Sequence, residues 1–319
     1  SSNHVVNQVA AIYRETNCDA IIAVGGGSVL DTAKGVNIVV TENTDDLLKF
    51  IGADRLNKKM KPLIAIPTTS GTGSEVTLVA VIANVERHNK MLFTSYRLLP
   101  DVAILDPRMT MTVPPRISAM TGMDALTHAI EAYSCLQKNP VSDAYAWAAI
   151  DLIRQNLLRV VENGKDEEAR MGMANASLLA GMAFSNSMVG IIHGIGHACG
   201  GVSGIPHGLA MAILLPHGME YNLQKCAPYY AELLMPLGGT DEVLVASAGK
   251  RAERTISLVK GLNDQLRKLT GMPVTLREVG IRIDQLPDIA NTAKGDGAMV
   301  YNPEEADYRD ILGILQRAY

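Results

Sequence analysis

Four of the seven histidines in this 319-residue chain fall within one short, apolar and glycine-rich stretch. His193 and His197 are four residues apart, and His207 and His217 follow them. Because few charged residues surround them, these imidazoles are expected in a water-poor interior, where each needs a partner. For a single buried histidine, that partner is usually a hydrogen-bond acceptor. Several histidines together instead favour a metal ion.

Asp124 and His128 form a second candidate pair upstream, in the segment 121–131. On a helix, residues four apart project from one face. The pair is either a buried hydrogen-bonded couple or half of a metal site. Together with His193 and one or two of the later histidines, it supplies one carboxylate and three imidazoles. This set has no thiolate and suits Fe(II), Zn(II) or another borderline divalent ion.

Two small, polar turns offer a different chemistry. Residues 25–28 read Gly-Gly-Gly-Ser where a buried strand is expected to turn into a helix, so backbone N–H groups and the helix dipole could hold a phosphate. A tight turn without a ligand remains the alternative. Residues 68–75 form a second turn, rich in hydroxyls, after the next strand; its alternative is a self-capped polar loop. Two such turns side by side are what a dinucleotide crevice requires.

The elements that position these residues divide the chain near residue 107. Before it, periodicity predicts helices over 4–15 and 28–40, strands over 18–24, 63–67 and 102–105, and a β-excursion over 78–84 and 90–94. The strand over 18–24 reads as buried on both faces. After residue 107, apolar residues recur at helical spacing to the end of the chain, including segments 119–133, 142–161 and 166–182. We expect a Rossmann-like α/β domain (1–107), lacking its first strands, and an all-helical metal-binding and catalytic domain (108–319).

Composition narrows the class of protein. The chain is 47% hydrophobic and 19% charged, with a net charge of −4, which argues against a nucleic-acid or anionic-membrane surface. It has no apolar run of about 18 residues, and we expect no signal peptide before the first helix. The cysteines form no CxxC pair and are expected to be buried, reduced thiols of a cytoplasmic protein. They are Cys18, Cys135, Cys199 and Cys226.

These motifs, in this order, resemble the iron-containing (group III) alcohol dehydrogenases. The resemblance covers essentially the whole chain and rests on segments 25–34, 67–75, 122–133, 193–197 and 206–208. It implies that Fe(II) or Zn(II) is held by Asp124, His128, His193 and His207. It also implies that His197 lies beside the nicotinamide as a catalytic residue without binding the metal. His217 has no catalytic counterpart and is taken as structural.

The same resemblance implies NAD or NADP as cofactor, a small alcohol or aldehyde as substrate and a homodimer or higher homo-oligomer. Members of the family begin with further strand-bearing segments, one of which selects NAD or NADP, and these are missing here. The implied cofactor-binding residues are Gly26, Gly27, Ser28, Asp31, Thr68, Thr69, Thr72, Ser74, Thr77 and Lys90. Phe184 and Ala298 are the implied substrate-pocket residues.

The leading functional hypothesis is reversible oxidation of an alcohol to an aldehyde or ketone by metal-assisted hydride transfer to NAD(P). A polyol dehydrogenase of the glycerol type is the alternative within the same superfamily. An inactive metal-binding or assembly fragment is the alternative outside enzymes, because the front of the nucleotide domain is missing.

Overall fold

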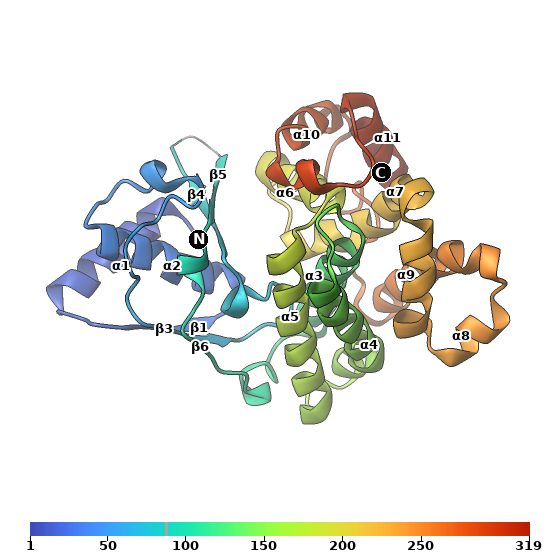
Figure 1. The fold of residues 1–319 in the computed structure, drawn as a ribbon, viewed down its shortest axis with the longest axis horizontal. Helices are drawn as coiled ribbons and strands as arrows, with labels where there is room; N and C mark the ends of the chain where they lie inside the picture. The colour runs from blue at the N-terminus through green and yellow to red at the C-terminus, as the bar shows by residue number, and fades with distance from the viewer. Residues whose placement is uncertain (87–88) are drawn as a thin grey trace.

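The structure is a computed structural model that describes residues 1–86 and 89–319. It consists of an α/β unit on one side and a larger bundle of helices on the other (Figure 1). The last strand of the α/β unit, β6 (Val102–Ala103), is followed by η4 (Pro107–Met109) and then by helices, with no further strand in the described part of the chain. The expected fold class is therefore confirmed, whereas a division at residue 107 stays a prediction.

The first sheet carries the two polar turns. Its three parallel strands lie in the order β1 (Ile21–Gly25), β3 (Leu63–Pro67), β6, with Gly25 paired with Pro67. The carboxyl ends of β1 and β3 are thus level, and the turns that follow them start at the same edge. This arrangement places both candidate phosphate sites together, as the sequence predicts.

Helix α2 (Gly27–Glu42) lies between this sheet and a second one. The second sheet has the order β2 (Gly52–Ala53), β5 (Asn89–Thr94), β4 (Val79–Asn84), with β4 and β5 antiparallel as the predicted β-excursion requires. Its tip, residues 87 and 88, lies outside the described residues. Helix α1 (Asn3–Glu15) packs on α2, and the short helices η1 (Leu47–Phe50), η2 (Ser74–Val76) and η3 (Tyr96–Leu98) complete the unit.

The expectation that strand 18–24 is buried on both faces is wrong. In β1 the side chains of Ile22 and Val24 are 65% and 47% exposed, whereas Ala23 is buried. The reason is that α2 covers one face of the sheet only, so the side chains alternate between covered and open positions. An unbroken apolar run does not by itself show that both faces are covered.

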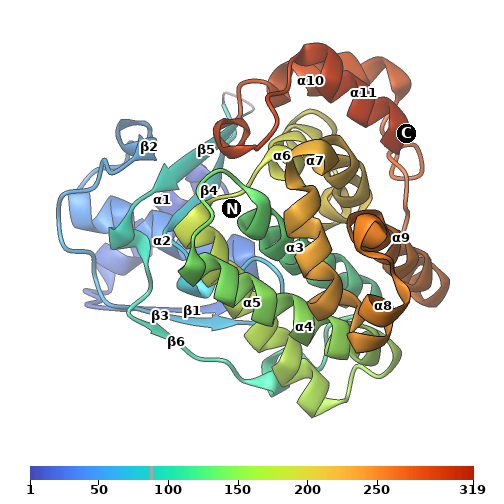
Figure 2. The ribbon, with the colours of Figure 1, turned by 45° about the vertical axis from the view of Figure 1, so that its right-hand side comes forward.

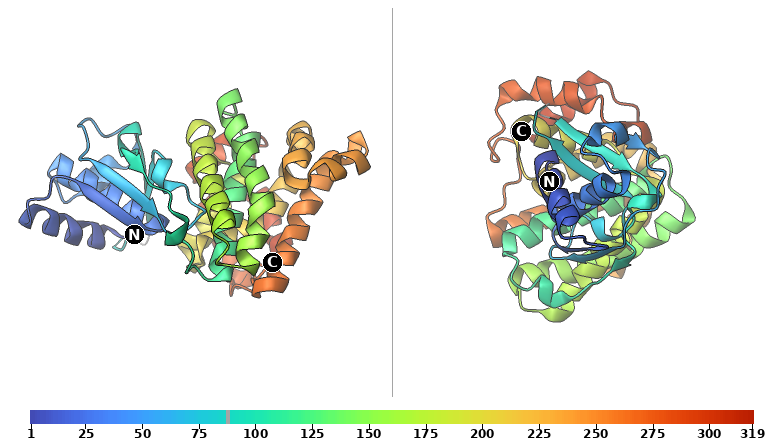
Figure 3. Two further views of the ribbon diagram at one scale, coloured as in Figure 1. Left: turned by 90° about the horizontal axis from the view of Figure 1, so that it is seen from below. Right: turned by 90° about the vertical axis from the view of Figure 1, so that its left-hand side faces the viewer.

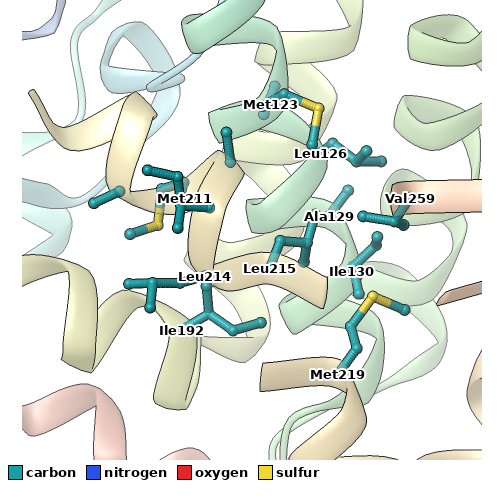
Figure 4. Packing of buried hydrophobic residues seen from close by; sticks show 14 of the residues in the cluster. Met123, Leu126, Ala129, Ile130, Ile192, Met211, Leu214, Leu215, Met219 and Val259 are labelled. Carbon is teal, nitrogen blue, oxygen red and sulfur yellow. The ribbon is translucent and has the colours of Figure 1, made fainter. Parts of the chain in front are cut away.

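The helical bundle is built around α3 (Pro115–Ser134), which is buried along nearly its whole length from Ser118 onward. Its apolar residues Met123, Leu126 and Ala129 lie in one cluster with Ile192 of the helix Ile191–Ser203 (α6) and Leu215 of the helix His207–Gly238 (α7) (Figure 4). A helix that is apolar all round belongs in the centre of a bundle. Around it lie α4 (Pro140–Glu162), α5 (Glu167–Ser187), α6 (Ile191–Ser203), α7 (His207–Gly238) and α9 (Arg251–Thr270).

The C-terminal segment closes over one end of this bundle. Helices α10 (Leu286–Ala293) and α11 (Tyr308–Ala318) pack on α6 and α7 respectively (Figure 2). Between them, η7 (Gly297–Tyr301) also contacts α6. The remaining short helices are α8 (Thr240–Val245), η5 (Ala248–Lys250) and η6 (Ile283–Gln285). Residues close to the C-terminus thus reach the helix that carries two of the candidate histidines.

None of the helices in the described ranges is by itself long and apolar enough to cross a membrane; α5 and α6 pass that test only as a pair bent by 106°. The cysteines are unpaired, as expected, but Cys18 is exposed rather than buried. It lies two residues after Thr16, the C-cap of α1, ahead of the first strand.

Candidate metal centre and cofactor cleft

Three helices bring the candidate ligands together. Asp124 and His128 lie on α3, His193 is in the first turn of α6, and His207 is the first residue of α7. Asp124, His128 and His193 each offer a ligand atom within 4.8 Å of the others. His207 lies at the edge of this group, with its Nε2 atom 3.4 Å from Asp124 Oδ1. The structure thus gathers all four predicted ligands, three of them tightly.

The chemistry of this cluster fits a divalent cation. Asp124 Oδ1, His128 Nδ1 and His193 Nε2 are buried and have no hydrogen-bond partner among the described residues. Burial raises the pKa of Asp124 to about 7. Burial also lowers the pKa of all three histidines well below its ordinary value, so their rings are neutral with lone pairs available. A bound cation would occupy these atoms and stabilise the carboxylate.

The sequence analysis missed Glu131, which supports His193 directly. The Glu131 carboxylate lies 2.5 Å from His193 Nδ1 and accepts a hydrogen bond of 2.8 Å from the backbone of Ile192. It therefore fixes the ring and at the same time caps the N-terminus of α6. This leaves Nε2 of His193 to face Asp124 and His128. A signal was present, because Glu131 is three residues after His128 on a buried helix.

His197 and His207 form the open side of the cluster, with side chains 25% and 31% exposed, whereas those of Asp124 and His193 are only 3% exposed. The ring of His197 stacks on that of His207 with centroids 5.4 Å apart. Its Nδ1 atom lies 3.0 Å from Asp296 Oδ2. Asp296 was not predicted, because it lies in a loop just before η7 where the chain shows no clear periodicity.

His217 lies outside the cluster. It sits on α7 with Nδ1 3.7 Å from Glu220, which also pairs with Lys260. This position is consistent with the resemblance, which implies no catalytic role for His217.

The two polar turns of the α/β unit touch each other. A Cβ atom at Gly26 would lie 3.0 Å from Thr69 Oγ1, and one at Gly27 would lie 2.6 Å from Thr72 Cγ2. Gly26 is the N-cap of α2 and provides no side-chain cap. The helix N-terminus thus opens between the turns, where the predicted phosphate-binding residues gather.

Some predicted cofactor residues have other partners. Asp31 accepts hydrogen bonds from Ser74 Oγ (2.8 Å) and from the backbone of Val81 (3.0 Å). Thr77 is 2% exposed and receives the ammonium of Lys34 at its backbone and hydroxyl oxygens. Asp31, Ser74 and Thr77 therefore hold the second turn in place rather than presenting free polar groups to the cleft.

The second turn also reaches the metal helix. A Cβ atom at Gly71 would lie 2.7 Å from the backbone oxygen of Thr121, one helical turn before the ligand pair on α3. From β5, Lys90 extends toward α6, where its ammonium would lie 3.3 Å from a Cβ at Gly200. The polar turns and the histidine cluster thus border the predicted cofactor cleft; Figure 3 shows the two units from two sides.

The two predicted substrate-pocket residues lie by the cluster. The ring of Phe184 stacks on that of His128 with centroids 4.4 Å apart. Ala298 is buried in η7, two residues after Asp296. Both thus lie close to residues of the histidine cluster, and their role in a substrate pocket stays a prediction.

Comparison with known proteins agrees with this geometry. Residues 1–107 match a family described as iron-containing alcohol dehydrogenase, and residues 118–319 match the C-terminal part of the Fe-containing alcohol dehydrogenase family. The chain belongs to the iron-containing alcohol dehydrogenase family. This confirms the resemblance and the predicted enzyme class, a metal-containing dehydrogenase.

Individual members of the iron-containing alcohol dehydrogenase family extend beyond this chain. The 1,3-propanediol dehydrogenase of Klebsiella pneumoniae is 40% identical over 309 residues, covering 97% of this chain and 78% of the relative. The NAD-dependent methanol dehydrogenase of Bacillus methanolicus is 37% identical over 313 residues, covering 98% and 80%. A solved structure of a 1,3-propanediol oxidoreductase matches with a TM-score of 0.95 and 39% identity, covering 100% of this chain and 81% of that one.

Proposed function

We propose that this protein interconverts a small alcohol and its aldehyde or ketone, using NAD or NADP and one divalent ion held by Asp124, His128, His193 and His207. The observation that carries the proposal is the set of three unpartnered, buried ligand atoms that face one another in the helical unit. When bound, the ion supplies Lewis acidity toward the substrate oxygen and the nicotinamide exchanges hydride with the substrate carbon. Fe(II) and Zn(II) both suit this ligand set.

The residues of the chain divide the remaining work. Backbone N–H groups at Gly27 and Ser28 bind the pyrophosphate at the start of α2. The turn from Thr68 to Thr72 lines the cleft beside them. Lys90 reaches across the cleft from the α/β unit and provides a positive charge near the bound cofactor.

At the reacting end, the buried side of the histidine cluster excludes water. His197, on the open side, is placed to exchange the hydroxyl proton with solvent because its ring is partly exposed. Phe184 limits the size of the substrate beside His128. Membership of a family that includes dehydrogenases of 1,3-propanediol and methanol supports a small alcohol as substrate.

The test is a substrate panel on protein loaded anaerobically with Fe(II) or Zn(II). Primary alcohols, 1,3-diols and glycerol are each offered with NAD and with NADP, and nicotinamide reduction is followed. We expect turnover of a primary alcohol or diol. Turnover of glycerol alone would favour the polyol alternative. Tight metal binding without cofactor binding or turnover would overturn the proposal and favour a metal-binding protein. Cytoplasmic location and a homodimer stay predictions.

A further inference from the structure

Asp296 uses its two carboxylate oxygens for two different segments. Oδ2 lies 3.0 Å from Nδ1 of His197 on α6. Oδ1 accepts a hydrogen bond of 2.9 Å from the backbone N–H of Ala298 and so caps η7. One side chain therefore ties the segment that carries a predicted substrate-pocket residue to the histidine on the open side of the metal cluster.

The carboxylate of Asp296 is able only to accept at these two contacts. Burial raises its pKa, but the hydrogen bonds from His197 and from the backbone of Ala298 act in the opposite direction, and the pKa lies below its ordinary value. Lys90, across the cleft, lies near enough for the opposite charges to interact. At neutral pH Asp296 is thus an ionised acceptor, and Nδ1 of His197 must be the donor.

We propose that Asp296 is a positioning residue that holds His197 as the Nδ1–H tautomer and leaves Nε2 as the ring nitrogen that exchanges the substrate proton. Nδ1 is the ring nitrogen that Asp296 engages, and the ring stands beside those of His193 and His207. In the oxidation direction the hydroxyl O–H bond breaks and an Nε2–H bond forms, after which the proton passes to solvent. This inference rests on the proposed function of His197.

The variant Asp296→Asn separates this role from capping. Asparagine caps helices as well as aspartate, but it has one oxygen where aspartate has two. If that oxygen continues to cap η7, the amide NH₂ points at His197 Nδ1 and requires it to be an acceptor. The proton then sits on Nε2, which is no longer able to accept another. A carboxylate-to-amide change that reverses the tautomer of a catalytic histidine is a known way to lose activity without losing the fold.

The experiment combines a spectroscopic and a kinetic measurement on the full chain loaded with Zn(II), which is diamagnetic. Long-range ¹H–¹⁵N correlation spectra report which nitrogen of each histidine carries the proton, and the variant His197→Gln identifies the His197 signals. Kinetics with an alcohol accepted by the wild type give kcat and KM. Asp288→Asn, the same substitution at an exposed position of α10, is the matched control.

We expect the wild type and Asp288→Asn to show Nδ1–H at His197, and Asp296→Asn to show Nε2–H. In Asp296→Asn, kcat should fall by about 10²-fold or more while bound zinc and KM for the cofactor stay unchanged. Adding Asp296→Asn to His197→Gln should cause no further loss, because the first change acts through the second residue.

An unchanged tautomer in Asp296→Asn, or an unchanged kcat despite a reversed tautomer, would overturn the inference. So would a further loss of kcat in the double variant. The tautomer is measured without turnover, so this outcome is distinct from failure of the proposed function, in which neither wild type nor variants oxidise any alcohol.

Discussion

Glu131 shows how much one carboxylate contributes to the candidate metal centre. It contacts the ring of His193 and the first backbone N–H groups of α6. Burial raises its pKa to about 7, against the effect of these hydrogen bonds. Burying the Glu131 carboxylate thus costs free energy. In return, Glu131 orients the ring of His193, whose Nε2 has no hydrogen-bond partner among the described residues.

Replacing Glu131 by Gln should weaken metal binding about 10–100-fold. The amide oxygen continues to accept from Ile192, so the NH₂ group faces His193 Nδ1 and favours a proton on Nε2, where the metal would bind. Competition with a chelator of known affinity gives the dissociation constant for Zn(II). Glu220→Gln, at a surface pair with Lys260, is the control. Equal affinity in Glu131→Gln and the wild type would show that the contact with His193 is only structural.

The ligands could be predicted from the sequence, whereas most of the residues that orient them could not. Local spacing was enough to single out Asp124, His128 and His193 as candidates, whereas the choice of His207 over His197 as the fourth ligand came from the family resemblance and stays a prediction. Glu131 meets its histidine across 62 residues and Asp296 across 99. Such pairings depend on how helices pack: the place of Glu131 on α3 was a local signal for its role, whereas no pattern in the chain encodes that of Asp296.

Helix α2 is fastened to the second sheet by a buried lysine. The ammonium of Lys34 donates to the backbone oxygens of Thr77 and Val79, both at 2.8 Å. Burial lowers its pKa to about 8, although Asp31 and Glu75 act in the opposite direction. In the folded state the lysine therefore releases its proton at a lower pH than in the unfolded chain, whose ordinary value is 10.5.

The pH dependence of stability follows from this shift. Between about pH 8 and 10.5 the unfolded state binds more protons at Lys34 than the folded state, so the contribution of this residue to the free energy of unfolding rises with pH. Relative to Lys34→Met, the wild type should gain roughly 3 kcal/mol across that window. Urea unfolding at several pH values measures the difference. Lys59→Met, at an exposed position, should show the same pH dependence of the free energy of unfolding as the wild type. A difference between the wild type and Lys34→Met that does not change with pH would refute the assignment.

The contact between η2 and α5 depends on two glycines. Gly73 has a φ of +62°, and a Cβ atom there would lie 2.6 Å from the Cα of Gly181. Gly73→Ala should therefore lower the free energy of unfolding by about 1–3 kcal/mol. Gly201→Ala, in α6 with nothing within 4 Å of its Cβ, should change it by no more than about 1 kcal/mol, toward higher stability. Chemical denaturation measures the free energy of unfolding of both variants. Similar values for the two would contradict the close approach of Gly73 to Gly181.

Helices and strands were predicted more reliably than their surroundings. The helical periods of α3, α4 and α5 and the β-excursion of β4 and β5 all appear in the structure. The exposed side chains of Ile22 and Val24 did not follow from the sequence, because an apolar run describes a strand and not what covers it. Local pattern thus identifies elements, and packing decides which faces are buried.

At the scale of the whole molecule, the candidate ligands join α3, α6 and α7, which surround the centre of the bundle. An ion bound to the folded state alone stabilises it by mass action. Removing the ion with a chelator should lower the melting temperature and increase amide hydrogen exchange in α6 and in the first turn of α7. An equal increase in amide hydrogen exchange in the α/β unit would show that the ion does not act at these helices.

The most direct test of the central claim is a titration of metal-free protein with Zn(II), in the wild type, His193→Ala and His217→Gln. We predict one tightly bound ion per chain in the wild type and in His217→Gln, recovery of alcohol oxidation in proportion to that ion, and loss of both in His193→Ala. Tight binding of the ion by His193→Ala, or full activity in the metal-free wild type, would contradict the account.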